Sequence, residues 1–225
     1  MSFHFQRANS RSLIVSHHYS NEYVEAFSQP MSRKSVLIAG TKDVDKRIFA
    51  ITIAEFLASQ NYAVIIITKS FNFLPQPLHG TARDSENYRN ISLRYPQNLS
   101  ELAEIIFDFS FFLKLSKGPF TVIAENIEDF GAPIENIAKL VAALGATPNI
   151  PSQEYPKLVA ILNCDPQSFP LENLYSLFNS IWITEKTEKE VCLSLQGRGK
   201  VCFEEMQLNS NCPNLVLRVK SILLH

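Results

Sequence analysis

From residue 35 onwards, short runs of apolar residues alternate with segments in which apolar residues recur every three or four positions. The first run, Ser35 to Gly40, ends in glycine and predicts a buried strand. The segment from Ile48 to Asn61 repeats at helical spacing and predicts a helix, and Tyr62 to Thr68 predicts a second buried strand. Strands alternating with helices in this way are typical of a parallel sheet covered on both faces.

The same alternation continues after a segment from Lys69 to Gln97, which is polar, contains several prolines and predicts a loop. Asn98 and Glu101 have the spacing of a helix cap and predict the start of the next helix. The further elements predicted are a helix to about Leu115, a strand at Phe120–Glu125, a helix at Pro133–Leu144, a strand at Lys157–Leu162, a short helix at Leu171–Phe178 and a strand at Ile181–Thr184.

The last part of the chain predicts strands without helices. Val191–Leu195 and Val201–Phe203 flank a glycine-containing turn and predict a hairpin, and Leu215–Ile222 predicts a final strand. The fold class expected is therefore α/β: a mostly parallel sheet flanked by helices and finished by antiparallel C-terminal strands. Residues 1–34, which are rich in Ser, His, Asn and Arg, are expected to form an N-terminal arm, and residues 35–225 one core domain.

The four cysteines lie far apart and form no CxxC pair, so the sequence indicates neither a zinc ribbon nor a disulfide framework, and reduced thiols are expected. With Arg198 and Gly199 at the hairpin tip, Cys192 would face Glu205. On that register, Cys192 and Cys202 are not cross-strand partners.

Composition narrows the function classes. A hydrophobic fraction of 46% is that of a chain with a sizeable core, and the formal net charge of −1 argues against a stand-alone nucleic-acid binder. Charged residues make up only 19% of the chain, which favours a surface covered by partner proteins. No apolar run long enough for a signal peptide or a membrane span is present, so we expect a nuclear or cytosolic protein without a membrane partner.

The turn after the first strand retains part of a phosphate-binding pattern. A P-loop has the form GxxxxGK[ST], and Gly40 and Lys46 match two of its four specified positions, between a strand and a helix. Asp45 replaces the second glycine with a negative side chain, and Arg47 replaces the magnesium-binding hydroxyl with a group that coordinates no cation. We therefore expect Asp43 or Asp45 to cap the helix in place of phosphate, and neither ATP nor magnesium to bind.

Glu125 ends the strand that begins at Phe120, where P-loop proteins carry the acidic residue that organises magnesium and water. The alternative is that a strand end at the edge of the sheet simply tolerates charge. The vestigial nucleotide-binding residues are then Gly40, Asp45, Lys46, Arg47 and Glu125. No Ser-His-Asp set or HExxH pattern indicates another catalytic or metal site, and no enzymatic activity is expected.

Residues 35 to about 205 resemble the RecA-type ATPase core. The resemblance is carried by the incomplete P-loop pattern and by the segments Ile91–Pro96, Glu101-Leu102 and Ala124–Phe130. Within that superfamily the chain most resembles the small recombinase paralogues that pair with a SWIM-domain protein in Shu-type complexes. The resemblance implies a RecA-like, non-catalytic nuclear subunit that helps a RecA-type recombinase assemble or persist on single-stranded DNA in homologous recombination repair. Its implied partners are the SWIM-domain protein, other recombinase paralogues and the recombinase.

The sequence departs from active recombinases in its connections after the third and fourth core strands. Residues 126–132 and 163–170 are short and contain neither Lys nor Arg, so we expect single-stranded DNA to be bound only within a complex. The candidate DNA contacts, for which solvated surface charge is the alternative, are Arg198, Lys200, Arg83, Arg89 and Arg94. The arm contains further candidate partner contacts. Phe5 and Ala8 form a Phe-x-x-Ala pattern, and Tyr23 and Phe27 belong to a second apolar patch.

Two other functions fit the same residues. The first is a RecA-like subunit of the Elongator accessory ring, which handles transfer RNA. The second is an active P-loop ATPase in which Lys46 and Glu125 still work. The identity of the partners distinguishes the Elongator role from the recombination role. Binding of ATP with magnesium distinguishes the active ATPase from both.

Overall fold

The computed structural model describes residues 35–69, 86–115, 118–131, 133–147, 150, 152–153, 155–165, 170–188, 190–195, 199–207 and 215–224. The predicted arm, with its candidates Phe5, Ala8, Tyr23 and Phe27, lies outside the described residues, as do Arg83 and Arg198. In the part that is described, no helix is both long and apolar enough to cross a membrane.

The described elements follow the order predicted from the sequence, with β3 added. They are β1 (Ser35–Gly40), α2 (Arg47–Ser59), β2 (Ala63–Ile67), η1 (Asn87–Asn90), β3 (Ile91–Arg94), α3 (Leu99–Leu115), β4 (Phe120–Glu125), η2 (Ile127–Phe130), α4 (Pro133–Gly145), β5 (Leu158–Asn163), η3 (Leu171–Leu174), β6 (Ser180–Lys186), β7 (Glu190–Leu195), β8 (Gly199–Gln207) and β9 (Leu215–Leu224).

These strands form a nine-stranded sheet in the order β3-β2-β4-β5-β1-β6-β7-β8-β9. The first six strands of this order, from β3 at the edge to β6, are parallel to one another. The pairs β6–β7, β7–β8 and β8–β9 are antiparallel. The predicted fold class is therefore confirmed. Because the parallel strands share one direction, the carboxyl ends of β1, β4 and β5 meet at one edge of the sheet.

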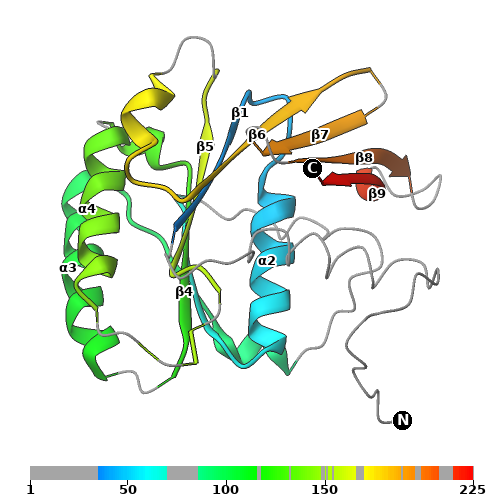
Figure 1. Cartoon of the computed structure of the whole chain (residues 1–225). Coiled ribbons are helices and arrows are strands. Elements are labelled where there is room, and N and C mark those ends of the chain that lie inside the picture. Colours follow the sequence, from blue (N-terminus) through cyan, green and yellow to red (C-terminus); the bar gives the residue numbers. More distant parts are fainter. Residues whose placement is uncertain are drawn as a thin grey trace.

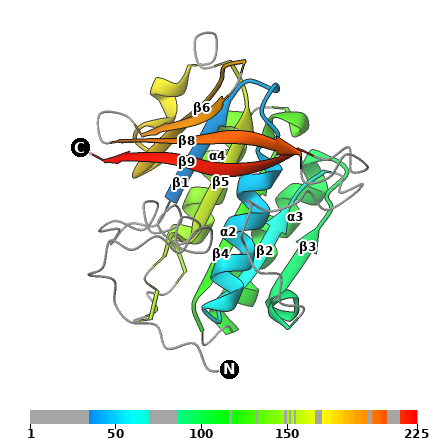
Figure 2. The same ribbon diagram turned by 90° about the vertical axis from the view of Figure 1, so that its right-hand side faces the viewer.

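Helices cover both faces of the parallel part. Helices α3 and α4 lie side by side on one face and α2 lies on the other (Figure 1). Strands β8 and β9 run across α2 (Figure 2), and the ring centroids of Phe49 on α2 and Phe203 on β8 are 5.4 Å apart. Helix α2 is accordingly buried along most of its circumference, which explains why its sequence is apolar on nearly all sides.

Two predicted element boundaries were wrong. Part of the predicted loop from Lys69 to Gln97 forms the strand β3, which pairs in parallel with β2 at the edge of the sheet. Its side chains alternate between half-buried and exposed, as at a sheet edge with one covered face. The short helix predicted over Leu171–Phe178 is only the single 3₁₀ turn η3.

The predicted cap of α3 is confirmed, since the Asn98 side chain accepts the Glu101 N–H at 3.0 Å.

The predicted register of the C-terminal hairpin was also wrong. Leu195 pairs with Gly199, so Gly199 lies in strand β8 and does not lie at the tip of the turn. As a result, Cys192 lies directly opposite Cys202, whereas Glu205 had been predicted as its partner. The two thiols are cross-strand neighbours.

Candidate functional site

The predicted phosphate turn begins where β1 ends, at the carboxyl edge of the sheet. Gly40 has φ of +154°, and a Cβ added there would lie 1.9 Å from the Thr184 hydroxyl oxygen on the neighbouring strand β6. Glycine is therefore required at position 40 by the close approach of β6, whether or not a phosphate binds.

The side chain of Lys46, just before α2, folds back into its own turn. Its Nζ donates hydrogen bonds to the backbone carbonyls of Thr41 and Val44 and, at 2.8 Å, to Oδ1 of Asn163 at the end of β5. Only 2% of Lys46 is exposed. Burial lowers its pKa to about 8, against the attraction of nearby acidic groups that include Asp43. The turn thus presents carbonyl oxygens to a cation, and that cation is its own lysine.

Asp45 and Arg47 occupy the start of α2. The Asp45 carboxylate accepts the backbone N–H of Arg47 at 3.1 Å and the guanidinium of Arg47 at 2.7 and 2.8 Å. This pairing raises the pKa of Arg47. The predicted aspartate cap is met only in part. The Asp45 carboxylate accepts the amide of Arg47, the first residue of α2, but the N-cap position is held by Lys46, whose side chain makes no cap hydrogen bond.

Glu125 lies at the carboxyl end of β4 and is only 1% exposed. Its carboxylate accepts a hydrogen bond from the Thr68 side chain, yet its Oε2 has no partner among the described residues. Burial raises the pKa of Glu125 to about 7, although Thr68 and the nearby Arg47 charge oppose the rise. A buried carboxyl group with one unsatisfied oxygen is costly to ionise.

Two asparagines that the sequence reasoning did not select connect these residues. Asn163 donates its side-chain amide to Oδ1 of Asn126 and its backbone N–H to Glu128 at 2.8 Å, while its own Oδ1 accepts from Lys46. Asn126 has φ of 53°, a left-handed conformation that asparagine tolerates better than most residues. Burial raises the pKa of Glu128. The sequence feature that could have identified them is their position, since Asn126 directly follows the apolar strand β4 and Asn163 ends the apolar strand β5.

The candidate DNA contacts among the described residues do not gather at one place, and the backbone carbonyl of Arg94 accepts the N–H of Thr68, the residue that contacts Glu125. Arg89 and Arg94 are exposed on η1 and the edge strand β3, and Lys200 lies on β8. In the order of the sheet, strands β2, β4, β5, β1, β6 and β7 separate β3 from β8. The pKa of Lys200 is raised, chiefly by the neighbouring thiols of Cys192 and Cys202.

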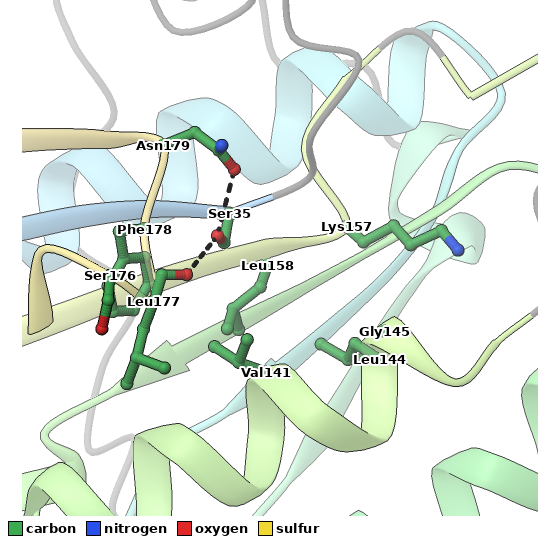
Figure 3. Close-up of a pocket in the computed structure, with 10 residues that line it drawn as sticks. All are labelled: Ser35, Val141, Leu144, Gly145, Lys157, Leu158, Ser176, Leu177, Phe178 and Asn179. Carbon is green, nitrogen blue, oxygen red and sulfur yellow. Dashed lines mark hydrogen bonds between the residues drawn. The ribbon is translucent and has the colours of Figure 1, made fainter.

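A cavity of about 260 Å³ lies at the opposite edge of the sheet, by the amino ends of β1, β5 and β6 (Figure 3). Ser35, Leu144 and Phe178 are among the residues that line it. The Lys157 amino group points away from the other lining residues (Figure 3). It donates a hydrogen bond to the Thr147 hydroxyl at 2.7 Å. This cavity is therefore separate from the cluster around Lys46.

No family model matches the chain, and no curated protein matches it. Solved structures do. The chain superposes on the RadB recombinase with a TM-score of 0.55 and 13% identity, over 76% of this chain and 86% of that one. It superposes on the flagellar accessory protein FlaH from Methanocaldococcus jannaschii with a TM-score of 0.55 and 10% identity, over 84% of this chain and 89% of that one. The ATPase domain of a protein named G40P gives a TM-score of 0.53 and 12% identity, over 82% and 84%.

The chain has a RecA-like fold. At these identities the likeness shows the fold alone, and the chemistry depends on the residues that this chain carries. In this RecA-like domain, the turn after β1, the end of β4 and the end of β5 lie at one edge of the sheet and carry a polar cluster. The cations of the cluster are paired, Lys46 with Asn163 and Arg47 with Asp45, whereas one buried oxygen of Glu125 and one of Glu128 have no hydrogen-bond partner among the described residues.

Proposed function

We propose that this chain is a non-catalytic RecA-like accessory subunit of a Shu-type complex, which promotes the assembly or stability of a recombinase filament on single-stranded DNA during homologous recombination. The observation that carries the non-catalytic part is the position of Lys46. Its amino group is held by the Thr41 and Val44 carbonyls inside the turn, where a nucleotide phosphate would have to enter.

A phosphate entering this turn would meet unfavourable groups. It would face the carbonyl oxygens that now surround the Lys46 amino group, and the Asp45 carboxylate at the helix start. Both are acceptors, so neither donates a hydrogen bond to phosphate, and Asp45 repels it. Arg47 replaces the hydroxyl that would bind magnesium, and its guanidinium is already paired with Asp45 in a two-point contact. These contacts support a site closed to ATP and magnesium.

The recombination setting rests on the resemblance in sequence, and the fold shared with the RadB recombinase is consistent with it. The near-neutral charge and the absence of Lys and Arg from residues 126–132 and 163–170 favour a subunit that contacts DNA through its complex. The partners proposed are a SWIM-domain protein, other recombinase paralogues and a RecA-type recombinase. The proposed location is the nucleus, with the cytoplasm as the alternative.

The non-catalytic assignment is tested by thermal unfolding of the full chain with millimolar ATP and magnesium. A ligand at a hundredfold excess over its Kd stabilises the folded state by about 2.7 kcal/mol, which is readily measured as a rise in Tm. We expect no rise. A rise that Lys46→Ala abolishes and Lys42→Ala, an exposed lysine of the same turn, preserves would establish the active ATPase instead.

The recombination assignment is tested by purifying the tagged full chain with its partners. Recovery of a SWIM-domain protein together with recombinase paralogues is expected. Recovery of two further RecA-like subunits in a ring would establish the Elongator alternative. In the purified complex, changing Arg198 and Lys200 to Glu should weaken the salt-dependent affinity for single-stranded DNA, whereas an unchanged affinity would remove these two residues from the DNA contact.

A further inference from the structure

Cys192 on β7 and Cys202 on β8 form a close pair of thiols. They are direct partners in the antiparallel ladder, and their Sγ atoms are 2.7 Å apart. Both are almost fully buried, with exposures of 3% and 8%. The neighbouring apolar residues of these strands, among them Leu193 and Phe203, point to the opposite face, toward α2. The two thiols therefore lie together on the face of β7 and β8 that turns away from that helix.

A bulge in β9 places a charged pair beside these thiols. Cys202 pairs with Ser221 but Phe203 pairs with Val219, so Lys220 is an extra residue in the edge strand at this point. The Lys220 amino group forms an ion pair with Glu190, which lies on β7 two residues before Cys192. This contact joins β9 to β7 across β8, the strand that carries Cys202.

We propose that Cys192 and Cys202 form an oxidation site, at which a small disulfide such as glutathione disulfide produces an intramolecular cross-strand disulfide. One cysteine thiolate attacks a sulfur of glutathione disulfide and releases one glutathione thiolate. The second cysteine thiolate then attacks the first cysteine sulfur and releases the other glutathione. Two protein thiols are oxidised, one glutathione disulfide is reduced, and the two protons pass to the released glutathione thiolates.

The backbone favours this bond. Directly opposite residues in an antiparallel ladder have Cα atoms about 4.5 or 5.5 Å apart, which lies within the range of about 4.4–6.8 Å that disulfides span. Forming the bond therefore requires the sulfurs to approach without a change in strand pairing. The site stands on this geometry and does not depend on the proposed recombination function.

A metal ion is the competing ligand for the same side chains. One ligand atom from each of Glu190, Cys192 and Cys202 lies within 4.8 Å of the others. Two thiolates on one tetrahedral zinc ion, each with a Zn–S bond of about 2.3 Å, would be roughly 3.8 Å apart. The observed 2.7 Å is shorter, and the Glu190 carboxylate is paired with Lys220. The geometry thus favours direct bonding of the sulfurs.

The surroundings indicate a slow reaction at neutral pH. Burial, together with the neighbouring Cys202 thiol, raises the pKa of Cys192, and only the thiolate attacks a disulfide. Glu190 on β7 and Lys200 on β8 act on Cys192, and Lys220 on β9 interacts with Cys202. Glu185 on β6 lies opposite Cys192 in the ladder and acts on Lys200. We therefore expect oxidation to be faster at pH 9 than at pH 7.

The test uses the full chain carrying Cys212→Ser, because the tryptic peptide that contains Cys202 would otherwise also contain Cys212. After incubation with glutathione disulfide at pH 9, the intact mass should fall by two hydrogen atoms. Trypsin should then release the fragments Glu190–Arg198 and Val201–Arg218 as one linked species that a reductant separates. The Tm should rise by about 5–10 °C on oxidation, because the bond restricts the unfolded chain.

Two variants made in the same background locate the bond. Cys192→Ser should abolish the loss of two hydrogen atoms, and Cys164→Ser, which removes a cysteine at the carboxyl end of the central strand β5, should preserve it. The proposal is overturned by a linked species that contains Cys164, or by glutathione that stays attached to Cys192 or Cys202. It is equally overturned by a stoichiometric zinc ion that protects both thiols from alkylation, which would establish a metal site.

Discussion

Replacing Glu125 with Gln should change how the stability of the protein depends on pH. Glu125 is buried at the end of β4, and one of its carboxylate oxygens has no partner among the described residues. Its pKa is raised from 4.5 to about 7 by burial. The folded protein therefore holds this proton more tightly than the unfolded chain. The protonated Glu125 side chain therefore contributes to the stability of the folded protein at low pH, and this contribution is lost as the pH rises from about 4.5 to about 7.

The size of the effect follows from these two pKa values. A change from 4.5 to about 7, at about 1.4 kcal/mol for each tenfold change in proton affinity, corresponds to about 3.4 kcal/mol once the carboxyl group is ionised in both states. Between pH 5 and pH 8, the part of this loss that is realised is about 2.5 kcal/mol. Glutamine stays neutral in both states. The Glu125→Gln variant should therefore lose about 2.5 kcal/mol less than the wild type over that interval.

The assay is urea unfolding of both proteins at pH 5, 6, 7 and 8, and the quantity compared is the change in the free energy of unfolding with pH. A constant offset between the proteins, from altered packing or a changed contact with Thr68, does not affect that comparison. Glu104→Gln, on the exposed face of α3, is the matched control and should leave the pH dependence unchanged. Parallel curves for wild type and Glu125→Gln would refute the reasoning, because they would mean that Glu125 ionises normally in the folded protein.

Two further substitutions test how the turn and the C-terminal strands are packed. Gly40→Ala should lower the free energy of unfolding by about 2–4 kcal/mol, since the new Cβ would collide with Thr184. Gly145→Ala, where an added Cβ would meet nothing within 4 Å beyond its own helix and chain neighbours, should change it by less than about 1 kcal/mol. Phe203→Ala should cost about 3–5 kcal/mol because its ring packs on Phe49, against less than about 0.5 kcal/mol for Phe107→Ala on the exposed side of α3. Urea unfolding measures both pairs, and equal losses within either pair would contradict the packing described.

Most of the fold was predictable because its central strands are buried on both faces. Such strands appear in the sequence as short, mainly apolar runs, as in Ser35–Gly40 and Phe120–Glu125, and their length of six residues favours a strand over a buried helix. The edge strand β3 was missed for the converse reason. Only one of its faces is covered, so Ile91 and Leu93 alternate with polar residues inside a polar segment.

The candidate site was predictable where a residue is fixed by its distance along the chain from a buried strand. Lys46, Asp45 and Glu125 satisfy that condition, and the structure brings them to the same edge of the sheet. Asn163 and Asn126 were missed, since their role depends on the adjacency of β4 and β5, which the order of elements alone does not specify.

The hairpin register could have been corrected from the hydrophobic pattern. Val191, Leu193, Val201 and Phe203 all point toward α2. If these four residues share one face, Cys192 must share the other face with Cys202, because side chains alternate along each strand. Pairing Cys192 with Glu205 would have placed Phe203 on the wrong side of the sheet. Choosing the turn from its glycine content alone ignored this constraint.

Strands β6 and β8 also restrict the turn between β1 and α2. Thr184 on β6 closes against Gly40, and Phe203 on β8 packs on Phe49 in the first turn of α2, so the turn is held between two packed strands at its start and its end. A rearrangement that turned the Thr41 and Val44 carbonyls away from Lys46 would have to disturb that packing, or leave the buried amine without its acceptors. If the site is closed to ATP as proposed, we expect Asp45→Gly alone to leave it closed, because the contacts of β6 and β8 that hold the turn would remain in place.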